Sequence, residues 1–364
     1  MLRIIPFVLM LLPLAACSSL SSNTPSDDTQ TSLPNADPNF LDGIYINNHI
    51  DHPEKSFFGF WKMRLFGEDE WHDPDTQKHL IPQTKVDHTK IKQPELRQVT
   101  WLGHSTFFIQ HNGLNILTDP IFSERASPFS FAGPKRYTPA PIKLSDLPPI
   151  DIVVISHNHY DHLDENSIKA LGNQPIYYIP SNLQKWFIQA GIDKAKIKPL
   201  RWWEKASLVN KKGIVTALPS QHWSARSLTD RNETHWASWL LELDGFTFWF
   251  AGDTGYNDKD FLDIGKYIDE VGKPLDLALI PIGAYAPRWF MKAYHVNTEE
   301  AVQIHHDINA KLSLGMHWGT FPLTAEKPME PYERLNKIRL QGGIKKGTNF
   351  KTLQIGETYH LTKD

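Results

Sequence analysis

Cysteine is almost absent from this chain, and so is any excess of charge of one sign. Cys17 is the only cysteine among 364 residues, so an intrachain disulfide is excluded. Lys and Arg number 38 against 41 for Asp and Glu, and the net charge of −3 provides no field that would gather nucleic acid. With 40% hydrophobic residues the chain can build a globular core, so partners must be sought in particular sites.

The apolar run at the start of the chain is too short to span a membrane as a mature helix. Residues 1–17, MLRIIPFVLMLLPLAAC, combine one basic residue, an apolar stretch and small residues before Cys17, which is typical of an export signal. The ending LAAC resembles the lipobox of bacterial lipoproteins, in which the cysteine becomes the acylated first residue. We therefore expect an exported bacterial lipoprotein, anchored through Cys17 in the outer membrane and facing the periplasm. The alternative is a chance ending that is removed together with its cysteine.

The rest of the chain divides into a short polar segment and one long domain. Residues 18–39 are mostly Ser, Thr, Asn, Asp and Pro, and we expect them to form a disordered tether. From residue 40 onward there is no second linker, internal repeat or low-complexity segment, so residues 40–364 are expected to form one domain.

Strand-like runs rich in β-branched and aromatic residues recur along that domain. Several are apolar throughout, as in sheets that are covered on both faces. Helical candidates lie between them: residues 165–171, with Asp164 as N-cap and Gly172 just past the end, and residues 298–308, behind Asn297 or Thr298. The mixture favours an α/β fold in which two packed, mixed sheets carry helices outside, over a doubly wound sheet.

Three histidines and two aspartates crowd the segment SHNHYDHLD, residues 156–164, directly after the apolar run DIVVI. Extended backbone sends His157 and His159 to the same side, where they can bind one ion, and the following turn brings Asp161 and His162 toward a second. A lone histidine is more often an ordinary core or surface residue. Four donors at this spacing after a strand indicate a metal site.

Three further donors stand where other strand-like runs end. They are His222 after GIVTALPSQ, Asp253 after FTFWFAG and His317 after KLSLGM. Each alone would be assigned a structural role, but together with the first four they make seven donors. That number suits two metal ions, about 3.5–4 Å apart, that share a carboxylate and a hydroxide.

The run HNHYDH resembles the HxHxDH signature of the metallo-β-lactamase superfamily. This resemblance implies a four-layer αββα sandwich and hydrolysis of esters, lactams, thioesters or phosphodiesters at a binuclear zinc site. The stretches WLGHST, DPIFSERASPFSFAGPKRY, QHWSAR, AGDTGY, PRWFMKAYHVNTEEAVQIH and HWGTFPL resemble, in order, the N-acyl-phosphatidylethanolamine-hydrolysing phospholipase D family.

This family resemblance implies a role for each donor. One zinc ion is bound by His157, His159 and His222, the second by Asp161, His162 and His317, and Asp253 bridges the two. Water activated between the ions then attacks phosphorus, so that no covalent nucleophile from the protein is needed. His104 and Asp119 are expected behind the ligands, where they would orient them, with ordinary strand-end packing as the alternative.

Substrate-binding roles are carried over to Tyr160 and His295, which match family positions that line the cavity. We expect them to act with Asp161 and Asp253 in catalysis by holding the phosphate or head group; a buried phenol and a core histidine are the alternatives. Tyr294 stands where we would expect a glutamine, which leaves the exact head group and acyl chain open.

A phospholipid substrate would require contact with a membrane. Residues 55–66, KSFFGFWKMRLF, carry aromatic residues with cations between them, as an interfacial helix would, although such a stripe also occurs in cores. A homodimer is left open as a partner arrangement. Two rival functions remain: another hydrolase of this fold, such as a sugar-phosphate lactonase, and a non-catalytic outer-membrane lipoprotein. Lactamases with a cysteine ligand are excluded, because Cys17 is the only cysteine.

Overall fold

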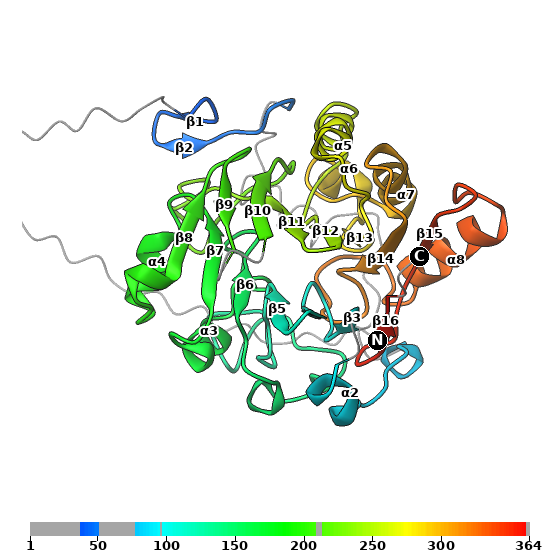
Figure 1. Cartoon of the computed structure of the whole chain (residues 1–364), viewed down its shortest axis with the longest axis horizontal. Helices are drawn as coiled ribbons and strands as arrows, with labels where there is room; N and C mark the ends of the chain where they lie inside the picture. Colours follow the sequence, from blue (N-terminus) through cyan, green and yellow to red (C-terminus); the bar gives the residue numbers. More distant parts are fainter. Residues whose placement is uncertain (1–36, 51–76, 95–96, 209–212, 362–364) are drawn as a thin grey trace, which may run out of the picture. The chain divides into compact units, whose positions relative to one another are not determined.

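Two seven-stranded sheets form the centre of the protein (Figure 1). The computed structural model describes residues 37–50, 77–94, 97–208 and 213–361. The predicted signal peptide with Cys17, nearly all of the tether and the candidate membrane helix 55–66 lie outside these residues. The described part belongs to one compact unit that begins at Asp37, and within it no helix has the length and apolar character needed to cross a membrane.

The first sheet has the strand order β16-β3-β4-β5-β6-β7-β8. Neighbours from β16 to β5 are antiparallel, and those from β5 to β8 are parallel. The strands are β3 (Arg97–Trp101), β4 (Phe107–His111), β5 (Leu114–Thr118), β6 (Ile152–Val154), β7 (Ile176–Pro180), β8 (Ile197–Leu200) and β16 (Thr358–His360).

The second sheet repeats this change of direction in the order β15-β14-β13-β12-β11-β10-β9. Strands β9 to β12 are antiparallel, and β12 to β15 are parallel. The strands are β9 (Lys205–Ser207), β10 (Gly213–Leu218), β11 (Ser238–Leu243), β12 (Phe246–Phe250), β13 (Leu277–Pro281), β14 (Leu312–Met316) and β15 (Asn349–Lys351). A separate pair, β1 (Phe40–Leu41) and β2 (Ile44–Tyr45), precedes both sheets.

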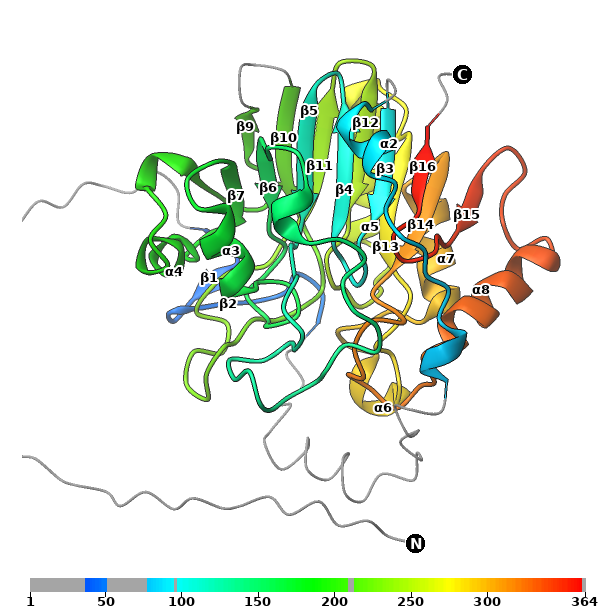
Figure 2. The same cartoon turned by 90° about the horizontal axis from the view of Figure 1, so that it is seen from below.

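Helices cover the outer faces of the sheets, as Figures 1 and 2 show. The helices are α2 (His88–Lys92), α3 (Glu165–Leu171), α4 (Gln184–Gln189), α5 (Asp260–Val271), α6 (Arg288–Met291), α7 (Thr298–Asp307) and α8 (Glu330–Leu340), with short 3-10 turns η1 (Lys78–Leu80), η2 (Leu144–Asp146) and η3 (Lys194–Lys196). The α/β fold with two mixed sheets and helices outside is confirmed as a four-layer αββα sandwich.

Successive side chains of a strand point to opposite faces of the sheet, which explains why so many strands are apolar at every position. In β6, Ile152 and Val154 belong to the core between the sheets, whereas Val153 belongs to a second cluster that α3 and α4 cover. The same division separates Ile116 from Leu117 in β5. Because successive side chains point to opposite faces, a strand buried on both sides needs apolar residues at every position.

Both predicted helix starts are confirmed. Helix α3 begins after Asp164 and ends before Gly172, whose φ of 54° is easily reached only by glycine. Helix α7 begins after Asn297, whose side chain accepts the backbone N–H of Glu300, while the Glu300 carboxylate accepts the N–H of Asn297.

One predicted strand run proves to be two strands. Residues 98–110 were expected to be strand-like throughout, but β3 ends at Trp101 and β4 begins at Phe107. Between them Gly103 and His104 have φ values of 99° and 51°, which reverse the chain and make β3 and β4 an antiparallel hairpin.

Candidate metal centre

The seven predicted donors converge because the strands that carry them end at the same side of the sandwich. Strands β10 and β12 run in the same direction, because both are antiparallel to β11 between them. Strand β14 also runs in this direction, because β12, β13 and β14 are parallel. His222, Asp253 and His317 therefore leave the second sheet at one edge. The loop after β6 of the first sheet, residues 155–164, faces them with the other four donors.

His157, His159 and His222 form the first group. His157 Nε2 lies 2.8 Å from His159 Nδ1, and His222 Nε2 lies 3.3 Å from the same His159 atom. Three ring nitrogens from two sheets thus point at one small volume, as the predicted first ion requires.

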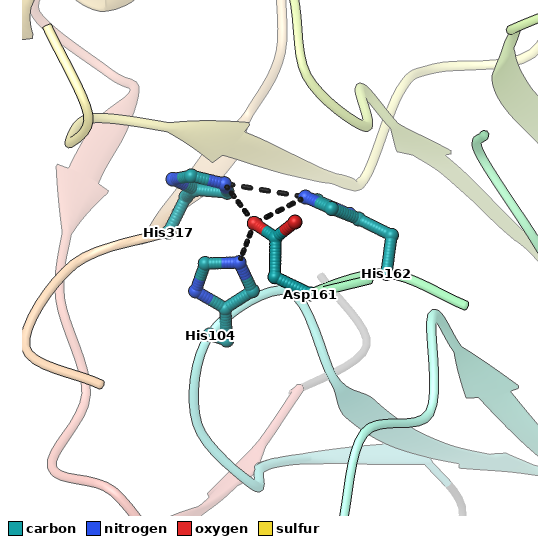
Figure 3. A group of neighbouring side chains, drawn as sticks. All are labelled: His104, Asp161, His162 and His317. Atoms are coloured by element: carbon teal, nitrogen blue, oxygen red, sulfur yellow. Dashed lines mark hydrogen bonds and ion pairs between the residues drawn. The ribbon is translucent and has the colours of Figure 1, made fainter. Parts of the chain in front are cut away.

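Asp161, His162 and His317 form the second group (Figure 3). Asp161 Oδ2 lies 3.3 Å from His162 Nε2 and 3.4 Å from His317 Nε2. The two imidazole nitrogens are 3.2 Å apart. His104, which belongs to the same group, donates from Nε2 at 2.8 Å to the same Asp161 oxygen, Oδ2, that faces His162 and His317.

Asp253 lies between the two groups. Its Oδ2 is 3.2 Å from His162 Nε2, 3.1 Å from His317 Nε2 and 3.9 Å from His222 Nε2. Its Oδ1 is buried and has no hydrogen-bond partner among the described residues. One carboxylate oxygen near nitrogens of both groups, and a second oxygen without a donor, is the arrangement that a bridging metal ligand needs.

Hydrogen bonds behind the donors fix the ring orientations. His162 Nδ1 donates to Asp119 Oδ2 at 2.7 Å, and Ser156 Oγ donates to the same oxygen at 2.5 Å. His157 Nδ1 in turn donates to Ser156 Oγ at 2.8 Å. With both Nδ1 atoms protonated, the Nε2 lone pairs of His157 and His162 face the site, where a metal ion would accept them.

His222 is held mainly by backbone and amide groups. Its Nδ1 donates to the carbonyl oxygen of Tyr294 at 3.0 Å. The Asn47 amide accepts the N–H of His222 at 3.0 Å and donates to its carbonyl oxygen at 2.9 Å. Any residue at position 294 would offer this backbone carbonyl, so a tyrosine there in place of the expected glutamine leaves the contact with His222 intact.

Strained and close-packed backbone supports the site. His104, Asp119 and His317 have φ values of 51°, 32° and 62°, which residues with a Cβ adopt at a cost. Gly252, just before Asp253, has a φ of 60°, and a Cβ there would lie 2.4 Å from the Cβ of Ser156. The glycine lets the loops after β6 and β12 approach each other.

Burial keeps the first group uncharged. It lowers the pKa of His157 and of His222 well below the usual value, and that of His159 to about 4. Burial also lowers the pKa of His104 to about 3. Neutral imidazoles are the form that binds a metal ion.

The charge of the imidazoles in the second group is set by two carboxylates, that of Asp161 and that of Asp253 between the groups. Burial alone would lower the pKa of His162 and His317, but the carboxylates of Asp253 and Asp161 raise it, to about 9 for His317. Burial would likewise raise the pKa of Asp161 and Asp253, yet His162 holds both well below the usual range. Two buried carboxylates require positive charge beside them. Protonated His162 and His317 supply it here, and a divalent cation bound by the neutral imidazoles would supply it instead.

Two residues predicted to bind substrate lie in different surroundings. His295 follows α6; its Nδ1 is 3.8 Å from Asp253 Oδ2, and its ring is 5.1 Å from that of His222. The Tyr160 hydroxyl donates to the carbonyl oxygen of Arg226 at 2.9 Å, and Tyr160 lines a cavity of about 530 Å³ with Arg226 and Trp186. Their roles stay predictions.

Ser156, Asn47 and Arg226 contact the site without having been assigned a role from the sequence. Ser156 and Arg226 stand in the quoted runs SHNHYDHLD and QHWSAR, so proximity to His157 and His222 could have drawn attention to them. Asn47 lies 175 positions from its partner His222, and no pattern in the sequence connects the two.

Comparison with known proteins agrees with this architecture. The family described as a beta-lactamase superfamily domain matches residues 114–318. N-acyl-phosphatidylethanolamine-hydrolyzing phospholipase D 1 of Caenorhabditis elegans is 42% identical over 272 residues, which are 72% of this chain and 75% of that protein. The mitochondrial N-acyl-phosphatidylethanolamine-hydrolyzing phospholipase D of Saccharomyces cerevisiae is 39% identical over 251 residues, 68% of this chain and 52% of that protein.

Among solved structures, isothiocyanate hydrolase from Delia radicum gut bacteria superposes with a TM-score of 0.58 at 18% identity, covering 73% of this chain and 100% of the other. A likeness at that identity shows the fold alone. The chain belongs to the metallo-β-lactamase superfamily. It is a metal-dependent hydrolase whose clustered His and Asp side chains are suited to a divalent metal, and its relatives include N-acyl-phosphatidylethanolamine-hydrolysing phospholipases D.

Proposed function

We propose that this hydrolase is a zinc-dependent phosphodiesterase of phospholipase D type. Its substrate is N-acyl-phosphatidylethanolamine or a related phospholipid, which it cleaves to phosphatidic acid and the N-acylethanolamine or corresponding head-group alcohol. The observation that carries the proposal is Asp253 Oδ2, which lies 3.1–3.9 Å from ring nitrogens of both donor groups. The relative at 42% identity supports the substrate class.

Two zinc ions fit the donor set. His157, His159 and His222 would hold one, and Asp161, His162 and His317 the other, with Asp253 shared between them. Imidazole and carboxylate are the donors that zinc takes in hydrolytic sites. When bound, such ions supply Lewis acidity toward water and toward a phosphoryl oxygen.

The remaining work falls to residues of the chain itself. His104 and Asp119 keep Asp161 and His162 in place through hydrogen bonds of 2.8 and 2.7 Å. His295, only 9% exposed and beside Asp253, is positioned to hold a phosphoryl oxygen or the departing head-group oxygen. Tyr160 is proposed to contact the head group with its ring, since its hydroxyl is engaged by Arg226.

The proposal is tested by analysing the products formed from a total lipid extract in ¹⁸O-labelled water. Zinc-loaded protein should release N-acylethanolamine and phosphatidic acid, with the label in the phosphate, because water attacks phosphorus and the head-group oxygen departs. His157→Ala and Asp253→Asn should abolish both products, whereas His306→Ala, a histidine of α7 outside the site, should not. If the protein opens sugar-phosphate lactones and leaves phospholipids intact, the substrate assignment is wrong.

We also propose that the mature chain is a lipoprotein held at the membrane through Cys17, so that the hydrolase works beside its lipid substrate. The proposal rests on the lipobox-like LAAC ending at residues 14–17, outside the described part of the structure.

A further inference from the structure

The loop after β6 carries ligand candidates for both proposed ions on a tight turn. The backbone N–H groups of His162 and Leu163 both donate to the carbonyl oxygen of His159, at 3.1 and 2.8 Å. His159 belongs to the first donor group, and Asp161 and His162 belong to the second. A change in the shape of this turn would therefore misplace donors of both groups.

Arg226, which lies outside that turn in the sequence, binds the residues at both of its ends. Its Nη1 donates to the carbonyl oxygens of Asn158 and Leu163, both at 2.8 Å, and these two residues flank the four-residue turn 159–162. One guanidinium nitrogen thus joins the two ends of the turn. Backbone carbonyls in a loop without strand or helix partners gain most from such a donor.

Tyr160, within the turn, binds the same arginine twice. The guanidinium carbon of Arg226 lies 4.0 Å from the centre of the Tyr160 ring, and the Tyr160 hydroxyl donates to the Arg226 carbonyl oxygen at 2.9 Å. The same guanidinium carbon lies 5.1 Å from the centre of the Trp186 ring of α4. The planar guanidinium is therefore fixed by stacking as well as by hydrogen bonds.

Arg226 also connects the two sheets at the metal centre. It lies four residues after His222, in the segment that follows β10 of the second sheet, while the turn it binds follows β6 of the first. Asp230 fixes this segment by accepting the backbone N–H of Arg226 at 3.0 and 3.1 Å. Arg226 thereby ties the segment that carries His222 to the turn that carries His159.

We propose that Arg226 is a positioning residue for the metal centre, which sets the turn 159–162 against His222 and so keeps the donors of both groups in register. Its guanidinium bonds are to the carbonyls of Asn158 and Leu163, so it acts through the backbone of the turn. The inference rests on metal binding at the proposed site, and it does not depend on the identity of the substrate.

Metal binding measured without substrate tests this role. Arg226→Met keeps an apolar stem against Tyr160 but loses both hydrogen bonds, and it should weaken zinc affinity about 10- to 100-fold in competition with a chromophoric chelator. The visible absorption spectrum of the cobalt-loaded variant should change as well, because the donors no longer hold their geometry. Arg226→Lys, which keeps the charge but not the planar fork, should fall between Arg226→Met and the wild type.

Arg125→Met is the matched control. Arg125 also braces a loop, donating to the carbonyl oxygens of Ser130 and Gly133, but that loop carries none of the metal donors. Its zinc affinity and cobalt spectrum should equal those of the wild type. If Arg226→Met fails to fold, Arg226→Lys and Tyr160→Phe, which removes only the hydroxyl contact, are measured instead.

The proposal is overturned if the Arg226 variants, or Tyr160→Phe and Arg226→Lys in their place, bind zinc as tightly as the wild type and keep its cobalt spectrum. It is also overturned if Arg125→Met loses as much affinity as Arg226→Met, since the effect would then be general loop loosening. A wild-type protein that binds no metal would instead refute the proposed function.

Discussion

Single hydrogen-bond acceptors behind the donors decide how the rings at this site point. Asp119 is not among the seven proposed ligands, yet its carboxylate accepts from His162 Nδ1, from Ser156 Oγ and, through Oδ1, from the Ser156 N–H at 2.7 Å. It therefore sets the tautomer of His162 directly and that of His157 through Ser156.

Replacing Asp119 by Asn should weaken zinc binding about 10- to 100-fold, because the amide retains one oxygen but turns a donor toward groups that already donate. Chelator competition measures the change. Asp151→Asn is the control: Asp151 also flanks a strand of the first sheet and accepts the N–H of Asn115 at 2.8 Å, but it has no contact with the donors. Equal affinities for Asp119→Asn and the wild type would refute the role given to Asp119.

The sequence predicted the donors better than their supports. His157, Asp253 and their partners have a chemistry that few other residue types share, and each follows a recognisable strand. The supports of His222 are a backbone carbonyl, that of Tyr294, and an amide, that of Asn47. Every residue has a backbone carbonyl, so no pattern of residue types could have indicated the contact with Tyr294. The contact with Asn47 could not be predicted because Asn47 is 175 positions away from His222 in the sequence.

At the scale of elements, α7 is joined to the second sheet by a buried histidine. His305 Nδ1 and the Ser313 hydroxyl of β14 are 2.7 Å apart, and His305 Nε2 lies 3.0 Å from the Thr348 hydroxyl, just before β15. Burial lowers the pKa of His305 to about 4. In the unfolded chain the pKa returns to about 6.5, so the unfolded state binds the proton more readily between these two values.

His305 should therefore make the fold less stable as the pH falls from about 6.5 toward about 4, with its full contribution present above that window. Urea unfolding of zinc-loaded wild type and His305→Gln at pH 8 and pH 5 measures the effect. The wild type should be more stable at pH 8, and its advantage should shrink by about 2 kcal/mol at pH 5. A difference that is independent of pH would show that His305 does not titrate in this way.

The strands predicted from the sequence are mostly those that are buried at almost every position, and they include β6 with only three residues. β12 and β13 are apolar at almost every position, and their runs were recognised. The edge strands β8, β9, β15 and β16 were missed. They include exposed or half-exposed positions, so they lack the continuous apolar pattern of a central strand.

At the scale of the whole molecule, the αββα sandwich brings donors from distant parts of the chain to one side. Nothing in residues 156–164 alone indicates that His317 lies 3.2 Å from His162. The resemblance to a known family supplied that placement, because the packing of one sheet on the other follows from many weak contacts and not from any single motif.

The proposed lipid anchor at Cys17 also concerns the whole molecule. If Cys17 carries lipid, Cys17→Ala should move the protein from the membrane fraction to the soluble fraction and should lower its activity on phospholipid vesicles. Hydrolysis of a soluble phosphodiester should be unchanged, because the donors lie far along the chain from residue 17. An unaltered membrane fraction for Cys17→Ala would contradict lipidation at this residue.

In the proposed centre, the two donor groups hold two metal ions that share Asp253. A crystal structure of the zinc-loaded protein, with anomalous data collected at the zinc absorption edge, tests it most directly. Two peaks are expected, one among His157, His159 and His222 and one among Asp161, His162 and His317, with Asp253 in contact with both. A map with no peak there, or with imidazoles turned away from each other, would rule out a shared metal centre.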